Sequence, residues 1–263
     1  MITRISFYIG ALVFLSAITW TICTTQESPP PDLEQFRLQQ QGGVWVTFQA
    51  IAAAIWTMPT TMRQLVGVQF FSWVAMFCIF LYFPTAIAHH TFGAATQASS
   101  VYTAGIQWAG LCLAIADGTC CLFSFLLAPL AVRLGRTVTH ALCLSFGAMA
   151  LVSLAFIDNP YWLFLPMVGL GIAKSSILTI PYAILSETLS VEKAGIYMGI
   201  FNIFTVIPQI VSALSLGWII THVFNNNQLD VLVLGGVSML VAAVFALRLE
   251  TQLDPSESTI YSS

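Results

Sequence analysis

The chain has 263 residues, of which 58% are hydrophobic and 7% are charged, and its formal net charge is -3. Soluble domains carry roughly 25% charged residues, so this composition excludes a soluble globular protein and predicts an all-α integral membrane protein. The net charge is a small difference between 8 basic and 11 acidic residues, and it indicates no nucleic acid or other strongly charged partner. The chain carries no phosphate loop, zinc motif or nucleophile elbow, so we predict neither an enzyme nor a cofactor or metal site.

Seven apolar windows are long enough to cross a bilayer, which needs about 20 residues per helix. They lie at 5–23, 65–88, 105–131, 138–157, 161–185, 196–220 and 229–248. No small-residue cleavage site follows the first window, so we expect a retained span rather than a signal peptide. All six cysteines fall within these windows without metal-ligand spacing, so we expect small residues buried in the membrane rather than disulfide partners.

A long polar segment, 24–43, separates the first two windows and contains three consecutive prolines, so we expect an exposed linker. From 44 to 60, apolar residues recur at helical spacing over a length that is short for a crossing, which predicts a helix on the membrane surface. Six basic residues then share one side of the membrane, and Arg4 marks the other. The six are Arg37, Arg63, Arg133, Arg136, Lys193 and Arg248. The positive-inside rule therefore predicts an external N-terminus and a cytoplasmic C-terminal tail. The chain has no Asn-x-Ser/Thr glycosylation acceptor, which fits a bacterial inner membrane.

Two formal charges lie near the middle of their windows: Asp117 in LAIADGTCC and Lys174 in GLGIAKSSILTIPYAILSE. Each costs about 2.5 to 3.5 kcal/mol at the bilayer centre, so both should face protein or water. Our hypothesis is that the two charges neutralise each other. Asp117 shares its helix face with small residues, and Lys174 adjoins a polar stripe that includes Tyr182, so these faces could meet. Two interpretations remain open: a carboxyl group that titrates with a transported proton, or an ion pair that only holds two helices together.

Two pairs of polar residues in the spans are candidates for binding a sugar. Asn202 and Gln209 are seven residues apart and share a helix face, and amides can both donate to and accept from hydroxyl groups; interhelical hydrogen bonding is the alternative. Gln69 and Trp73 are one turn apart and could combine a hydrogen bond with a flat surface for a pyranose ring; simple packing is the alternative.

Adjacent histidines, His89 and His90, follow the second window. Neighbouring helical residues point in different directions, and no acidic residue or cysteine lies nearby, so we do not predict a metal site there.

Several stretches together resemble the C-terminal half of major facilitator superfamily transporters, in particular the sucrose and maltose proton symporter-like group related to solute carrier family 45. They are MPTTMRQLVGVQFFSWVAMFCIFLYF, AIAHHTFGA, VTHALCLSFGAMALVSLAFI, PYAILSETLSVEKAGIYMGIFN and VLGGVSMLVAAVFALR. The resemblance covers nearly the whole chain. It implies a fold of two six-helix halves that bind substrate between them and expose it alternately to each side.

The resemblance also implies a division of the chain into four parts. These are the last helix of the N-terminal half (1–23), a cytoplasmic linker with an interfacial helix (24–64), the six-helix C-terminal half (65–248) and a cytoplasmic tail (249–263). The implied function is proton-coupled uptake of a sugar such as a disaccharide. The residues expected to line the sugar site are Gln69, Trp73, Tyr182, Asn202 and Gln209.

The loop VRLGRT, 132–137, resembles the superfamily's cytoplasmic D-R-x-G-R-K signature and keeps Arg133, Gly135 and Arg136. The acid of the signature is replaced by Val132, so we expect any gating latch to use another acid, such as Glu187 or Glu192. Relatives in this group usually carry uncharged side chains at the positions of Asp117 and Lys174, so the resemblance assigns no role to that pair.

A half-transporter supplies only one wall of a substrate cavity, so the resemblance implies a partner in the bilayer, either a separate N-terminal half or a second copy of the chain. The alternatives are a transport-inactive membrane interaction or scaffold protein, and a carrier of a non-sugar small metabolite on the same fold.

Overall fold

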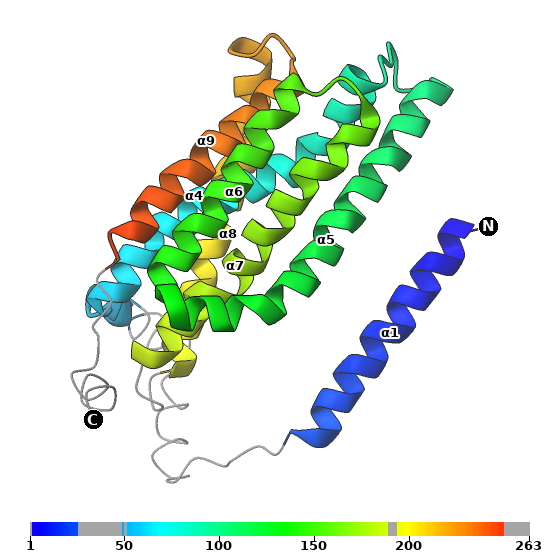
Figure 1. Cartoon of the computed structure of the whole chain (residues 1–263). Coiled ribbons are helices and arrows are strands. Elements are labelled where there is room, and N and C mark those ends of the chain that lie inside the picture. Colours follow the sequence, from blue (N-terminus) through cyan, green and yellow to red (C-terminus); the bar gives the residue numbers. More distant parts are fainter. Residues whose placement is uncertain (1, 26–48, 50–51, 189–193, 250–263) are drawn as a thin grey trace. The chain divides into compact units, whose positions relative to one another are not determined.

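The computed structural model describes residues 2–25, 49, 52–188 and 194–249. These residues are helical apart from short connections, and no strand occurs among them. Seven of the described helices are long and apolar enough to cross a membrane. The predicted all-α architecture with seven spans is therefore confirmed, and the chain is a multi-pass membrane protein (Figure 1).

The chain divides into two compact units, Met1–Ala52 and Ala53–Ser263. The first contains helix α1, Ile2–Thr24, whose large apolar side chains, including Phe7 and Trp20, are exposed. The hydroxyl groups of Ser16, Thr21 and Thr24 donate to carbonyl oxygens of the preceding turn, as Ser16 does to Leu12 at 2.7 Å. These hydroxyl hydrogens are therefore hydrogen-bonded within the helix, which suits a helix surrounded by lipid.

Six long helices make up the described part of the second unit. They are α4 (Thr60–Ala86), α5 (Ser100–Leu134), α6 (Arg136–Ser153), α7 (Phe164–Thr188), α8 (Ala194–His222) and α9 (Gln228–Leu247). A single wide turn, Ile87–Thr91, continues α4, and two short 3-10 turns, Leu154–Phe156 and Pro160–Leu163, join α6 to α7.

Several helices extend beyond their predicted windows because polar turns continue them past the apolar core. Helix α4 begins at Thr60 rather than at 65, and α5 reaches from Ser100 to Leu134. The predicted surface helix at 44–60 falls largely outside the described residues, as do the linker beyond Thr25 and the tail from 250. Residues 49 and 52–56 are helical.

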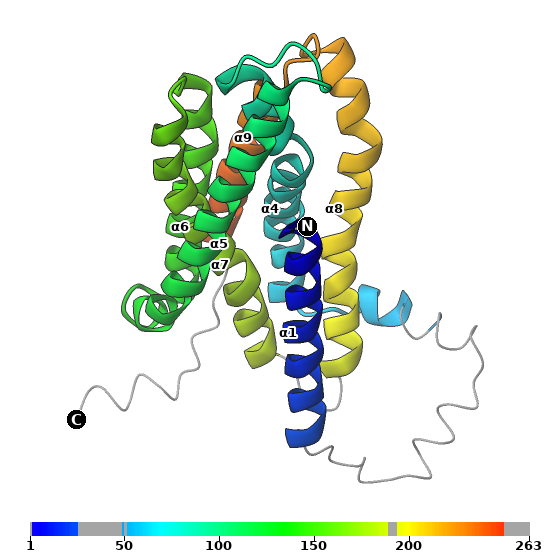
Figure 2. The ribbon, with the colours of Figure 1, turned by 90° about the vertical axis from the view of Figure 1, so that its right-hand side faces the viewer.

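Each of the six long helices of the second unit packs against at least one of the others. Helix α6 packs against α7 and α9, α9 packs against α4, α5 packs against α7, and α8 packs against α4 (Figure 2). Helix α5 also contacts α4 and the turn Ile87–Thr91 that continues it. Among the six helices, α5 and α8 bury the smallest shares of their residues. Apolar side chains such as Leu122, Phe125 and Leu214 remain exposed on these two helices.

Glycines set the closest approaches between helices of the second unit. A Cβ added at Gly147 of α6 would lie 2.5 Å from Ala173 Cβ of α7, and one added at Gly236 of α9 would lie 3.1 Å from the Ala148 carbonyl oxygen of α6. Small residues let these backbones approach closely, which is the usual basis of helix packing in membranes. Prolines lie inside four helices, namely Pro84 in α4, Pro129 in α5, Pro181 in α7 and Pro208 in α8, whereas α6 and α9 contain none.

Candidate functional site

The structure brings together the two charges in the middle of the spans. Asp117 lies halfway along α5 and Lys174 halfway along α7. The Lys174 ammonium donates to Asp117 Oδ1 and forms an ion pair with it. The pair joins two helices that are 57 residues apart in sequence at these positions.

Gly171, one turn before Lys174, explains why these side chains can reach each other. A Cβ at this position would lie 2.4 Å from the Ala116 carbonyl oxygen and 2.6 Å from Thr119 Cβ, both on α5. No side chain fits there, so the backbones of α5 and α7 come into direct contact. The short side chain of Asp117, next to Ala116, is thereby brought within reach of the lysine.

An aromatic ring on a third helix contacts the same lysine. The Lys174 Nζ atom lies 5.9 Å from the centre of the Phe80 ring on α4. A cation over an aromatic face is stabilised by about 0.5–1 kcal/mol at an exposed site and by more when it is desolvated. Lys174 therefore has two anchors, a carboxylate on α5 and an aromatic face on α4. We did not predict Phe80, because its span contains several phenylalanines at helical spacing and nothing in the pattern distinguishes one of them.

The ion pair lies on the open side of the six-helix unit, not in its interior. The Asp117 side chain is 61% exposed, and that of Lys174 is 23% exposed. A carboxylate at the bilayer centre is costly in contact with lipid, by about 2.5–3.5 kcal/mol. This exposed half of the pair therefore requires water or another protein surface.

A second polar contact lies two turns further along α7, about 12 Å from Lys174 at 1.5 Å per residue. The Tyr182 hydroxyl donates to Asn202 Oδ1 on α8 at 3.3 Å, and the Tyr182 ring packs edge-on against Phe201 with centroids 5.0 Å apart. Asn202 is exposed and Gln209, two turns further along α8, is half-buried. Two of the predicted sugar-binding residues, Tyr182 and Asn202, are thus in contact with each other.

The other predicted pair lies inside the unit. Gln69 is 0% exposed, and neither polar atom of its amide has a hydrogen-bond partner in the described part of the chain. Trp73 is half-buried, and its Nε1 atom is buried without a partner. An unpaired buried polar group costs about 1–3 kcal/mol, so this part of α4 retains unused hydrogen-bonding capacity. No hydrogen bond joins Gln69 or Trp73 to Asn202 among the described residues.

His140 is a buried polar residue that the sequence interpretation missed. It is 0% exposed on α6, and its Nδ1 atom lies 2.5 Å from Ser176 Oγ on α7. Its Nε2 atom has no partner within the described ranges. The available signal was its position inside the apolar window 138–157, where a histidine needs a hydrogen-bonding partner. The contact joins the second turn of α6 to the middle of α7.

The signature-like loop, 132–137, makes a contact at the end of the spans where α6 begins. Gly135 has φ +83°, a conformation that favours glycine, and it joins α5 directly to α6. Arg136 forms an ion pair with Glu187 near the end of α7, and its Nη1 atom donates to the Ala183 carbonyl oxygen at 3.1 Å. Arg133 is exposed and has no ion-pair partner in the described ranges. Glu192, the other candidate acid, lies outside those ranges.

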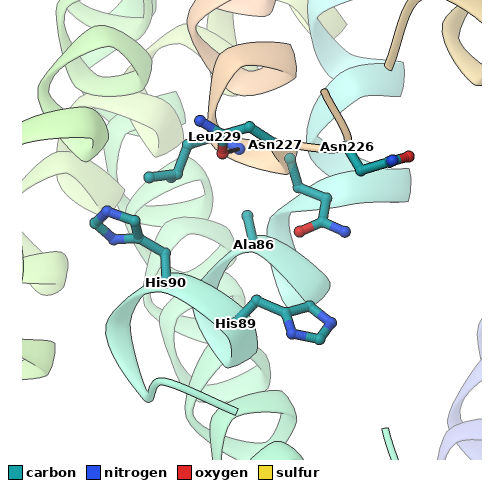
Figure 3. A pocket seen from close by; sticks show the side chains of 7 residues that line it. Ala86, His89, His90, Asn226, Asn227 and Leu229 are labelled. Carbon is teal, nitrogen blue, oxygen red and sulfur yellow. Dashed lines mark hydrogen bonds between the residues drawn. The ribbon is translucent and has the colours of Figure 1, made fainter. Parts of the chain in front are cut away.

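A pocket of about 380 Å³ opens at the opposite end of the spans. It is lined by Ala86, His89, His90, Asn226, Asn227, Gln228 and Leu229. Figure 3 shows the rings of His89 and His90 pointing to opposite sides of their helical turn, and His89 Nδ1 is 2.7 Å from the Ala94 carbonyl oxygen. No group of three or more His, Cys, Asp or Glu side chains suited to a metal ion occurs among the residues that the structure describes.

Comparison with known proteins places this geometry in a family. Residues 65–260 match the sequence profile described as Major Facilitator Superfamily. The chain is also similar to two proteins named Sucrose transport protein SUT5, from Oryza sativa subsp. indica and Oryza sativa subsp. japonica. Identity to each is 23% over 269 residues, covering 92% of this chain and 50% of the relative. The chain thus spans about half the length of the curated relatives it matches. The matched range includes Asp117, Lys174 and every helix from α5 to α9, and the resemblance seen in the sequence is confirmed: the chain belongs to the Major Facilitator Superfamily.

Proposed function

We propose that this chain forms the C-terminal half of a secondary active transporter that takes up a sugar, such as a disaccharide, together with a proton by alternating access. The superfamily is one of membrane transporters rather than enzymes. The observation that carries the proposal is the Asp117–Lys174 ion pair, open on one side at the middle of the spans. The similarity to proteins named for sucrose transport supports a sugar as the substrate.

The exposed side of the ion pair supports a partner in the bilayer. An exposed carboxylate halfway along α5 is costly against lipid but not against a second protein wall with a hydrated cavity between the two. We assign that wall to an N-terminal half, in the same polypeptide or in a separate one, or to a second copy of this chain. We assign 1–23 to the last helix of the N-terminal half, 24–64 to a cytoplasmic linker and 249–263 to a cytoplasmic tail. This assignment follows the positive-inside rule, and the missing glycosylation acceptor supports a bacterial inner membrane.

Asp117 is the residue that we assign to proton coupling. While ionised, it attracts Lys174; two unit charges 4 Å apart interact by about 4 kcal/mol at an effective dielectric of about 20. Water around the exposed carboxylate reduces this value. Protonation removes the attraction, while Lys174 keeps its contact with the Phe80 ring on α4. Binding of a proton therefore weakens the contact between α5 and α7, and the Lys174 ammonium still has one favourable contact, with the Phe80 ring.

The polar groups near the pair supply contacts for sugar hydroxyls. Tyr182 and Asn202 link α7 to α8 through one long hydrogen bond, which a hydroxyl group can replace. Gln209 offers a further amide on α8. Gln69 and Trp73 enter the site only after α4 has moved, because Gln69 is completely buried in this structure. The Arg136–Glu187 ion pair serves as the latch that joins the cytoplasmic ends of α6 and α7.

Uptake of radiolabelled sucrose into proteoliposomes tests the proposal. The chain is reconstituted alone and with a candidate N-terminal half, with and without an inward proton gradient. We expect accumulation only with a partner and a gradient, and we expect Asp117→Asn to retain sugar exchange but to lose its dependence on the gradient. Asp158→Asn, at an exposed carboxylate between α6 and α7, is the matched control and should keep the dependence.

Unchanged proton coupling in the Asp117→Asn variant would exclude the titrating role and leave a structural ion pair. Absence of accumulation in every condition would favour the scaffold alternative. Accumulation of another polyol or metabolite, but not of sucrose, would replace the sugar with a different substrate on the same fold.

A further inference from the structure

Two arginines that lie far apart in the sequence meet at one end of the second unit. Arg63 is in the first turn of α4, and Arg248 directly follows the last turn of α9. Both are exposed, and both line a pocket of about 250 Å³ together with Gln64, Gly67 and Phe245. The packing of α4 against α9 brings the two side chains to the same pocket.

Neither guanidinium group has an acidic partner in the part of the chain that the structure describes. The ion pairs found there are Arg136–Glu187 and Lys174–Asp117, which lie elsewhere. Two positive charges around one pocket repel each other, and an anion between them removes that repulsion. The planar fork of arginine matches the oxygens of a phosphate group and binds them through paired hydrogen bonds.

An aromatic side chain, Phe245, also lines this pocket. The rings of Phe71 and Phe245 stack with centroids 5.7 Å apart and planes 22° apart. Gly67 leaves room for this arrangement, since a Cβ there would lie only 3.0 Å from Phe245 Cδ1. Phe245 remains 39% exposed, so an apolar surface runs from the pocket onto the outer side of α9. The pocket therefore combines two basic side chains with an apolar surface.

The location of the pocket indicates which kind of phosphate-containing ligand it suits. Span α4 begins and span α9 ends at the pocket, which places it at the level of the lipid headgroups. Basic pockets between membrane helices at this level suit anionic headgroups, with the acyl chain against neighbouring apolar side chains. We propose that Arg63 and Arg248 bind the phosphate of an anionic glycerophospholipid, with one acyl chain lying along Phe245. The proposal does not depend on sugar transport or on which side of the membrane this end faces.

Native mass spectrometry of the full chain in detergent tests the site with phosphatidylglycerol and phosphatidylcholine of identical acyl chains. We expect phosphatidylglycerol, which is anionic, to bind more tightly than phosphatidylcholine. Arg63→Gln and Arg248→Gln should each weaken phosphatidylglycerol binding about fivefold, equivalent to about 1 kcal/mol per charge, and the double variant should weaken it about 25-fold. The matched control is Arg133→Gln, which removes an exposed positive charge at the same end of the spans, outside the pocket, and should change binding less than about twofold.

Three results would overturn the proposal. Unchanged phosphatidylglycerol binding in the double variant would show that these arginines do not hold the lipid. An equal loss with Arg133→Gln would indicate attraction to the general surface charge rather than to a site. Displacement of the lipid by millimolar inorganic phosphate would indicate a site for free anions. Thermal unfolding of each variant, which we expect to match that of the unmodified chain, verifies that a loss of binding is not a loss of fold.

Discussion

The contact between α5 and α7 at Gly171 leads to a quantitative prediction about a single methyl group. In Gly171→Ala the new Cβ would lie 2.4 Å from the Ala116 carbonyl oxygen, and ordinary contact begins at 3.4 Å, so α5 and α7 must separate by about 1 Å (3.4 − 2.4). Nothing flexible can move aside, because the obstructing atoms belong to the backbone and the Cβ of α5. Overpacking of this kind costs about 1–3 kcal/mol. Alanine also favours a helix over glycine by about 1 kcal/mol, which offsets part of that cost.

Gly118→Ala is the matched control, because this glycine lies on α5 with no atom within 4 Å of an added Cβ. It receives the helix preference without the clash. The free energies of unfolding of the two alanine variants should therefore differ by about 1–3 kcal/mol, with Gly171→Ala the less stable. Thermal unfolding in detergent, followed by circular dichroism, measures this difference, since each kcal/mol moves the Tm by about 2–4 °C in a protein of this size. Equal Tm values for the two variants would refute the close approach at Gly171, and with it our explanation of how Asp117 reaches Lys174.

Three further predictions concern the polar contacts. Lys174→Met should lower the free energy of unfolding by about 1–2 kcal/mol, less than the 3–5 kcal/mol of a fully buried pair because Asp117 is 61% exposed, and adding Asp117→Asn should restore part of the loss in a double-mutant cycle. Ser176→Ala should lower the free energy of unfolding by about 1–3 kcal/mol because it leaves His140 Nδ1 unpaired. Ser175→Ala, which removes a buried hydroxyl group without a partner among the described residues, should cost much less; similar Tm values for the two would contradict this assignment. Glu187→Gln should cost about 0.2–1 kcal/mol through the loss of the exposed ion pair with Arg136, and the loss should shrink in high salt; a loss that is independent of salt would rule out an electrostatic origin.

The architecture was predictable from the sequence because a bilayer imposes one requirement on every span. A window of about 20 apolar residues has few structures available to it other than a membrane helix. The seven windows, the family and the all-α class followed from that requirement together with the quoted stretches, and all three are confirmed. The helix ends were less predictable, since polar turns such as the one that begins at Thr60 carry no apolar signal.

The site was predictable from the sequence only where a single residue would be energetically unfavourable in the membrane without a partner. Asp117 and Lys174 are conspicuous because isolated charges are expensive in hydrocarbon, and each is the natural partner for the other. Phe80 and Gly171 carry no such cost, and their roles depend on which helices become neighbours in the folded unit. The same dependence separates Gln69 from Asn202. Both are amides in apolar spans, yet one is enclosed between helices and the other is exposed.

The prolines divide the second unit into helices with and without a weak point. A proline inside a helix removes one backbone hydrogen bond and displaces the carbonyl four residues earlier, which for Pro84 is that of Phe80. An internal proline occurs in each of α4, α5, α7 and α8, whereas α6 and α9 contain none and pack against each other. Helices α6 and α9 therefore form the stiffest part of this unit. Any opening or closing of this half would come from bending of the four helices that contain a proline. Three of these four helices hold Asp117, Lys174 and Phe80.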